Sequence, residues 1–156
     1  MVEEGAQRPS RDQVTQGWNY LPMAGYSGTP LAKKIGIKDE HVVFLDGAPD
    51  DLELDTGAAT VVRRLPKTAD VTLSFQTSYA ALESRLPTLF DRTTTAGMVW
   101  VCWPKKAAQK AFGIVSDIDE NKVRDLGLEL GFVDVKVAAV DDTWSGLKFV
   151  RRLSDR

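Results

Sequence analysis

Two lysines stand where the predicted fold would expose them to a ligand. An unbroken apolar run begins at Met98 and ends at Pro104, and Lys105 and Lys106 follow it directly. Its valines and tryptophans, with no charge among them, predict a central strand covered on both faces, as in a parallel sheet between helices. Ligands of open α/β sheets bind beyond the carboxyl ends of the strands. The lysines are therefore candidates for binding an anion, and their alternative is a solvated loop.

Three further candidates follow other predicted segments of the sheet. Gly47 lies in the turn after a predicted strand at His41–Leu45. Ser78 precedes a helix after the predicted strand Val71–Phe75, and Trp144 lies in a hairpin turn. Because the carboxyl ends of parallel strands meet at one rim, all three should gather near the two lysines. The helix after Ser78 would add free N–H groups that favour an anion.

Each of these three candidates also has a purely structural alternative. Gly47 can serve only its turn, which would cap a short helix from Pro49 to Leu54. Ser78 can act only as a helix cap. Trp144 can anchor the hairpin on the core, which suits the size of its ring.

The residue types needed for catalysis are scarce. His41 is the single histidine and stands at the start of a predicted strand, away from the expected rim. Cys102 is the single cysteine and lies inside the apolar run, which predicts a buried, unreactive thiol. The acidic residues near the rim have no evident partner for acid–base chemistry. We therefore expect no catalytic residue, no metal site and no cofactor, and an anionic small molecule as the ligand.

Composition and charge bound the remaining possibilities. A length of 156 residues suits one domain, and the net charge of -2 predicts no surface for nucleic acid or for a charged membrane. No apolar run is long enough to span a bilayer and no signal peptide is recognised, so we expect a cytoplasmic protein. Residues 1–24 are polar and aperiodic, which predicts a flexible N-terminal tail ahead of an α/β domain at residues 25–156.

Two longer helices are predicted within the domain. The first is indicated by apolar residues at helical spacing, Leu82, Leu86, Leu89 and Phe90. Pro87 should kink that helix or restart it. The second should run from about Ile118 to Leu130, and Asp117 and Glu120 would begin it as a capping box.

The strand pattern leaves one connection open. Phe132–Val140 and Leu147–Arg152 should pair as a terminal antiparallel hairpin. Thr60–Leu65 reads as a short strand, but the connector after it is too short for a helical crossover. It is either a stub at the sheet edge or a strand reached without a helix. Arg63 and Arg64 also stand where a nucleotide-binding fold usually has an acidic residue for the ribose, which argues against NAD.

The order of these elements resembles the S-adenosylmethionine-dependent methyltransferase fold. The resemblance implies a single-domain, Rossmann-like three-layer sandwich with a mostly parallel sheet. It also implies that the C-terminal antiparallel hairpin strand lies inside the sheet, between the strands that contain Met98 and Val133. We expect the central strand to be flanked by parallel neighbours apart from this antiparallel strand.

Four segments resemble a family of small uncharacterised bacterial proteins, domain of unknown function 3052 (DUF3052). They are Gly25–Ala32, Gly47–Asp50, Trp103–Lys106 and Asp142–Leu147, within a match from about Gly25 to Leu153. The segments occur in the family's order. Membership would imply the fold and no established activity.

The sequence departs from working methyltransferases at the cofactor loop. In those enzymes the first strand ends in an acidic, glycine-rich loop that wraps the methionine part of the cofactor. Here the corresponding turn, which begins at Asp46, has one glycine, Gly47, and a proline, Pro49. The region that should hold a whole αβ unit and the ribose-binding carboxylate is compressed between Thr56 and Asp70.

Three functions remain open on these observations. The first is a non-catalytic module that binds an anionic small molecule through Lys105 and Lys106, between the Gly47 and Trp144 loops. The second is a methyltransferase with an unusual cofactor loop. The third is an interaction or regulatory protein that holds a partner chain through the Trp144 hairpin or the tail.

Overall fold

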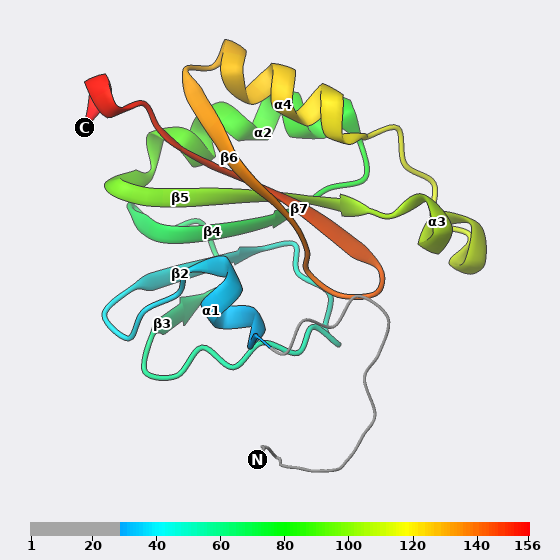
Figure 1. The fold of residues 1–156 in the computed structure, drawn as a ribbon, viewed down its shortest axis with the longest axis horizontal. Helices are drawn as coiled ribbons and strands as arrows, with labels where there is room; N and C mark the ends of the chain where they lie inside the picture. Colours follow the sequence, from blue (N-terminus) through cyan, green and yellow to red (C-terminus); the bar gives the residue numbers. More distant parts are fainter. Residues whose placement is uncertain (1–28) are drawn as a thin grey trace.

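A six-stranded sheet with helices on both faces forms the centre of the molecule (Figure 1). The computed structural model describes residues 29–156, so the predicted tail at residues 1–24 and the first residues of the predicted domain lie outside the described part. The strands are β2 (Val42–Asp46), β3 (Thr60–Val62), β4 (Ala69–Phe75), β5 (Thr93–Pro104), β6 (Phe132–Ala139) and β7 (Trp144–Arg151). The helices are α1 (Leu31–Ile35), α2 (Tyr79–Asp91), α3 (Lys106–Phe112) and α4 (Glu120–Glu129), with a 3-10 turn at Leu153–Asp155.

The strand order confirms the predicted arrangement of the hairpin. The order is β3-β2-β4-β5-β7-β6, in which β3, β2, β4 and β5 are parallel and β7 is antiparallel to both of its neighbours. The last strand therefore lies between β5 and β6, as the resemblance implied. The expectation of parallel neighbours holds only for the β4 side of β5, because β7 occupies the other side.

The central strand β5 is buried on both faces, and each face contributes to a separate core. One core packs residues of α2 and α4 against the sheet and includes Val99 and Val101. The other packs α1 against the opposite face and includes Trp100 and Cys102. This alternation is the pleat of a strand covered on both sides. The predicted three-layer sandwich is thus confirmed.

The structure resolves the open connection to β3 and corrects the segment before it. β3 is a three-residue edge strand parallel to β2, and no helix lies between the two. The predicted helix from Pro49 to Leu54 is wrong, since this segment contains only a turn in which the Leu52 N–H bonds the Pro49 carbonyl at 3.2 Å. Leu52 and Leu54 instead alternate, with both side chains packed against the core under α1.

The helix caps also differ from the sequence prediction. Asp119, not Asp117, caps α4, because its Oδ1 accepts a bond from the Lys122 N–H at 2.9 Å. Asp117 instead accepts from the N–H of Tyr79, the first residue of α2, at 2.7 Å. Pro87 lies within one continuous helix, so the predicted restart does not occur.

No helix within residues 29–156 is long and apolar enough to cross a membrane.

The shortest helix besides α1 is α3, which projects from the end of the molecule beyond β5 (Figure 1). Its last residue, Phe112, is 69% exposed. This segment therefore contributes little to either core.

We predict that Gly127→Ala destabilises the protein by about 1–3 kcal/mol. Alanine normally stabilises a helix relative to glycine, but a Cβ at this position of α4 would collide with the ring of Phe149 on β7. Urea unfolding monitored by circular dichroism measures the change. Equal or greater stability of the variant would show that α4 does not pack this closely on β7.

Candidate functional site

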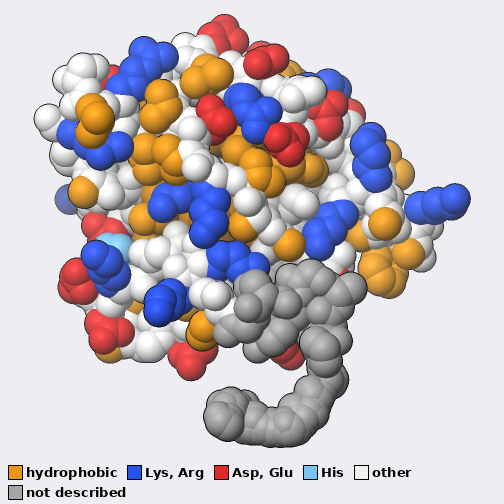
Figure 2. Space-filling model, in the orientation of Figure 1, with side chains coloured by type: hydrophobic (Ala, Val, Ile, Leu, Met, Phe, Trp, Pro, Cys, Tyr) orange, Lys and Arg blue, Asp and Glu red, His pale blue; other side chains and the backbone are white. Residues whose placement is uncertain are grey.

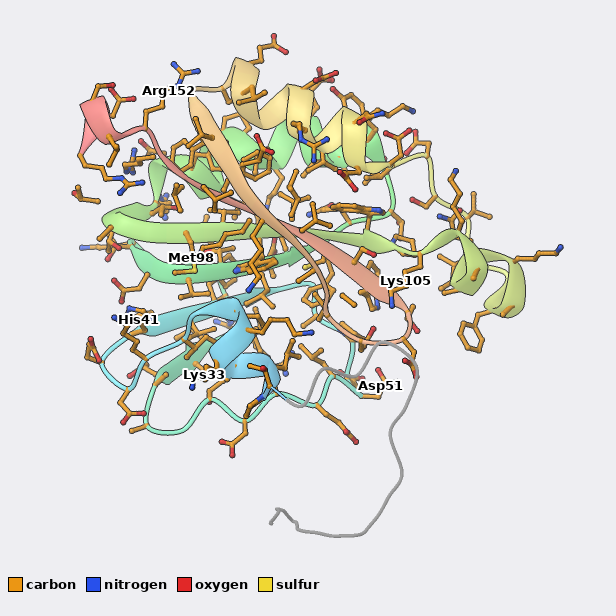
Figure 3. All side chains as sticks on the ribbon, in the orientation of Figure 1. Lys33, His41, Asp51, Met98, Lys105 and Arg152 are labelled. Atoms are coloured by element: carbon orange, nitrogen blue, oxygen red, sulfur yellow. The ribbon has the colours of Figure 1, made fainter. Side chains whose placement is uncertain are left out.

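The carboxyl ends of the parallel strands meet at one edge of the sheet, and four of the five candidates follow these ends. Gly47 follows β2, Ser78 lies beyond β4, and Lys105 and Lys106 follow β5. In Figure 3, Lys105 and Asp51 lie at this edge, whereas His41 lies at the opposite edge. The single histidine is therefore remote from the candidate site.

Gly47 and Trp144 both lie next to Phe75, the last residue of β4. The Trp144 ring lies edge-on to Phe75, with centroids 5.2 Å apart, and is half-buried against the core under α1. Gly47 has a φ of 70°, and a Cβ there would lie 3.4 Å from the Phe75 carbonyl oxygen. Trp144 thus anchors the start of β7, and the Gly47 turn needs a residue that tolerates a left-handed backbone.

Lys105 and Lys106 line a cavity of about 560 Å³, together with residues at the start of α4. The backbone N–H of Lys105 donates to the Thr143 carbonyl at 2.8 Å, which fixes the start of this wall. The other lining residues are Trp103, Pro104, Ile118, Asp119, Glu120, Asn121, Val137 and Ser145. Gly47, Ser78 and Trp144 do not line this cavity. The structure thus places all the candidates at one edge but brings only the two lysines into one cavity.

The acidic groups of the cavity are already engaged, and the lysines are not. Asp119 caps its own helix, and the Glu120 carboxylate pairs with Arg124 at 2.6 Å. No side-chain hydrogen bond or ion pair of Lys105 or Lys106 is found within residues 29–156. The two lysines that line the cavity therefore have no direct partner for their charge among the described residues.

The amino end of α2 is already occupied by the protein. The Ser78 hydroxyl accepts from the Ala81 N–H at 3.3 Å, and the Asp117 carboxylate accepts from the Tyr79 N–H. A negative charge at this end satisfies the free N–H groups and the helix dipole. It would also repel a second anion. The role of Ser78 that the structure displays is capping, and its ligand role stays a prediction.

A polar network between β2 and α2 was not predicted. Arg85 on α2 pairs with Asp46 at the end of β2 through two bonds, Nη2 to Oδ1 at 2.9 Å and Nε to Oδ2 at 3.2 Å. The buried Ser74 hydroxyl donates to the same Asp46 Oδ2 at 2.7 Å, and the Gln76 amide donates to Ser74. The available signal was an arginine, Arg85, placed between the leucines of the apolar helix face.

Within the described residues, this network leaves the end of β2 without a free carboxylate for S-adenosylmethionine. The Asp46 carboxylate is 15% exposed and holds Arg85 in a bidentate pair, so it is not available to a ligand. β3 is followed by Arg63 and Arg64, both exposed, and by no carboxylate suited to ribose hydroxyls. The proline of the Gly47 turn, Pro49, offers no N–H. Within the described residues, no group of three His, Cys, Asp or Glu side chains could hold a metal ion.

Comparison with known proteins identifies the fold and not the family. No family model matches the sequence, and no curated protein matches it. Solved structures do match. One is the O-methyltransferase NcsB1 from neocarzinostatin biosynthesis, in complex with S-adenosylmethionine and 2-hydroxy-5-methyl naphthoic acid. Its TM-score is 0.53 at 13% identity, over 81% of this chain and 51% of that one.

The chain has a methyltransferase-like fold. Similar structures include the ribosomal protein L11 methylase of Lactobacillus delbrueckii subsp. bulgaricus, with TM-score 0.48, 11% identity and coverage of 78% and 75% of the two chains. Magnesium protoporphyrin IX methyltransferase from Synechocystis PCC 6803, with bound SAH, has a TM-score of 0.47 and 12% identity, over 60% of this chain and 52% of that one. The chain thus spans about half the length of NcsB1 and of the Synechocystis enzyme. Membership of DUF3052 stays a prediction.

We predict that Arg85→Ala lowers the free energy of unfolding by about 1–3 kcal/mol, because it leaves the Asp46 carboxylate without its bidentate partner. Arg63→Ala, at an exposed position beyond β3, is the matched control and should change stability little. Urea unfolding of both variants measures the difference. Equal stability of the two variants would contradict a structural role for the pair.

We also predict that Cys102 does not react in the native protein. Burial raises the pKa of its thiol, with a smaller contribution from Asp141, so the reactive thiolate does not form near neutral pH. The change in absorbance on reaction with the thiol reagent DTNB should indicate no reactive thiol in buffer and one reactive thiol per chain in urea. Labelling of the native protein at the rate found in urea would contradict the burial.

Proposed function

We propose that the protein binds a small anionic molecule in the cavity lined by Lys105 and Lys106. The observation that carries the proposal is that the carboxylates lining this cavity have hydrogen-bond or ion-pair partners, whereas its lysines have none among the described residues. Its two carboxylates are held by α4 residues, while its two ammonium groups have no direct partner within the described residues. An anion would supply the missing charge in a partly enclosed space, where screening by water is weaker than on an open surface.

The shape and lining of the cavity suggest the rest of the ligand. Its volume, about 560 Å³, lies in the usual range for small-molecule sites. Trp103 and Ile118 are both less than a tenth exposed and form an apolar wall, while Ser145 and Asn121 offer hydrogen bonds. We infer a ligand with a carboxylate or phosphate group and an apolar body. The proposal includes no catalytic step and places the protein in the cytosol.

Methyl transfer is the second candidate, and the fold favours it. The likeness to NcsB1 supports this alternative more than it supports a protein without catalysis. The Asp46–Arg85 pair argues against it, because a cofactor at the end of β2 would have to displace Arg85. A titration with S-adenosylmethionine separates the two candidates. Micromolar binding would promote methyl transfer and require Arg85 to move.

We predict that the double variant Lys105→Ala/Lys106→Ala folds normally and loses affinity for an organic anion by tenfold or more, about 1.4 kcal/mol or more. The ligand would first be found by thermal shift, among carboxylate- and phosphate-bearing metabolites, and its affinity measured by calorimetry. Surface lysines contribute little to stability, so the melting temperature without ligand should stay near that of the parent.

The matched control is Lys110→Ala, which removes an exposed lysine of α3 that does not line the cavity. It should keep full affinity. If the double variant also keeps full affinity, the ligand binds elsewhere and the proposed function fails.

A further inference from the structure

Three lysines from three different elements lie in the region where the carboxyl end of α1 approaches the hairpin of β6 and β7. The Lys34 ammonium donates to the Ala139 carbonyl of β6 at 3.3 Å, and the Lys136 ammonium donates back to the Lys34 carbonyl at 3.2 Å. The Lys148 ammonium, from β7, lies 3.9 Å from the position of a Cβ on Gly36, just after α1. Figure 2 shows Lys and Arg side chains gathered across the middle of the face that carries α1 and β6.

Two of these lysines are directly opposed in the sheet. Lys136 and Lys148 are partners in the antiparallel β6–β7 pairing, next to the bulge at Val135. Side chains of directly opposite residues point to the same face with Cβ atoms about 4.5–5.5 Å apart, and like charges at such positions are destabilising. The protein therefore maintains a repulsive contact on this face.

The surroundings of the pair do not supply a compensating carboxylate. Within residues 29–156, Lys34 and Lys136 form hydrogen bonds only to backbone carbonyls, which suits the negative end of a helix but does not neutralise their charge. Lys148 has no hydrogen bond or ion pair within residues 29–156, and it is half-buried. Burial, and then the charge of Lys136, lower the pKa of Lys148. The nearest acid along β6, Asp134, is already paired with Arg124 of α4.

We propose that Lys34, Lys136 and Lys148 form a second binding site, for a phosphate-type oxyanion carried by a small molecule. Lysine ammonium groups are compact charges on flexible stems, so three of them can converge on one tetrahedral dianion without a fixed geometry. The bound anion would remove the repulsion between Lys136 and Lys148. It would also give Lys148 a partner that the described residues do not provide.

This site is distinct from the cavity of Lys105 and Lys106. Leu147, the neighbour of Lys148 along β7, belongs to the core under α2 and α4, so Lys148 points to the opposite face of the sheet. Val137, next to Lys136, lines the cavity, and alternation likewise sends Lys136 away from it. The two sites lie on opposite faces, and one can fail without the other.

The test compares Lys148→Met with the parent, using inorganic pyrophosphate as the probe. Without pyrophosphate, in chloride buffer, the variant should melt at a higher temperature than the parent, because an unpaired, half-buried charge and its repulsion by Lys136 are gone. With pyrophosphate at matched ionic strength, the parent should gain clearly more in melting temperature than the variant. Calorimetry should show at least tenfold weaker binding for the variant.

The matched control is Lys33→Met, which removes an exposed lysine of the same helix α1 that has no hydrogen bond to the cluster within the described residues. It should keep the pyrophosphate response. Lys136→Gln is the second variant and should weaken the response as Lys148→Met does. Amide NMR shifts should locate the bound probe at Gly36, Lys136 and Lys148.

Several results would overturn the proposal. One is a parent protein that does not respond to pyrophosphate, and another is an undiminished response in Lys148→Met. A third is loss of the response in Lys105→Ala/Lys106→Ala, which would place the anion in the cavity and support the proposed function instead. Retention of the response in that double variant supports a separate site, even if no ligand of the cavity is found.

Discussion

The hydrogen bond from the buried indole of Trp100 to the carbonyl of Ile35 holds three elements of the structure in place. Trp100 is fully buried on β5, so its N–H must find a partner inside the protein, and it donates to Ile35 at 3.0 Å. Ile35 is the last residue of α1, a five-residue helix too short to be stable alone. The same ring requires a glycine on β7, because a Cβ at Gly146 would lie 2.9 Å from Trp100 Cε3. α1, β5 and β7 are therefore positioned by one side chain.

Both proposed sites depend on the register that this contact fixes. With Cys102 opposite Gly146, Trp103 pairs with Ser145, which brings Ser145 to the cavity wall. The same strand β7 places Lys148 opposite Lys136 on the face where α1 ends. A slip of β7 by one residue would exchange its two faces and remove both arrangements. The packing of Trp100 thus affects the two proposed sites through the pairing of the strands and not through direct contact.

The parts of the fold that sequence could predict depend on patterns local to one segment. The apolar run before Pro104 predicted β5, and leucine spacing predicted α2, because burial on one element leaves a period in its own residues. The caps were harder. Asp117 resembles a cap for α4 but bonds Tyr79 of α2, and only the tertiary structure decides between the two helices. The segment after Pro49 could form a turn or a helix, and the docking of its leucines on the core selected the extended form.

The positions of the candidate residues in the fold were easier to predict than the partners of the charged groups. The rule for α/β sheets placed the candidates at the carboxyl edge, and the structure puts them there. The partners of charged groups could not be predicted, because they come from distant positions. Asp46 meets Arg85 across 39 residues, and Lys148 meets Lys136 through a hairpin whose bulge sets the pairing. A sequence shows which charges exist, and only the register shows which of them are paired.

The distribution of paired and unpaired charge then decides where a ligand can bind. At the ends of β2 and β4, Arg85 satisfies Asp46, and Asp117 satisfies the start of α2. A ligand there would have to break hydrogen bonds of the protein before it formed its own. Each bond that it gained would replace one that the protein already makes. At Lys105 and at Lys148 no such bond needs to break. Binding at these lysines would disrupt fewer existing bonds, which is why both proposals place the anion there and not at the ends of β2 and β4.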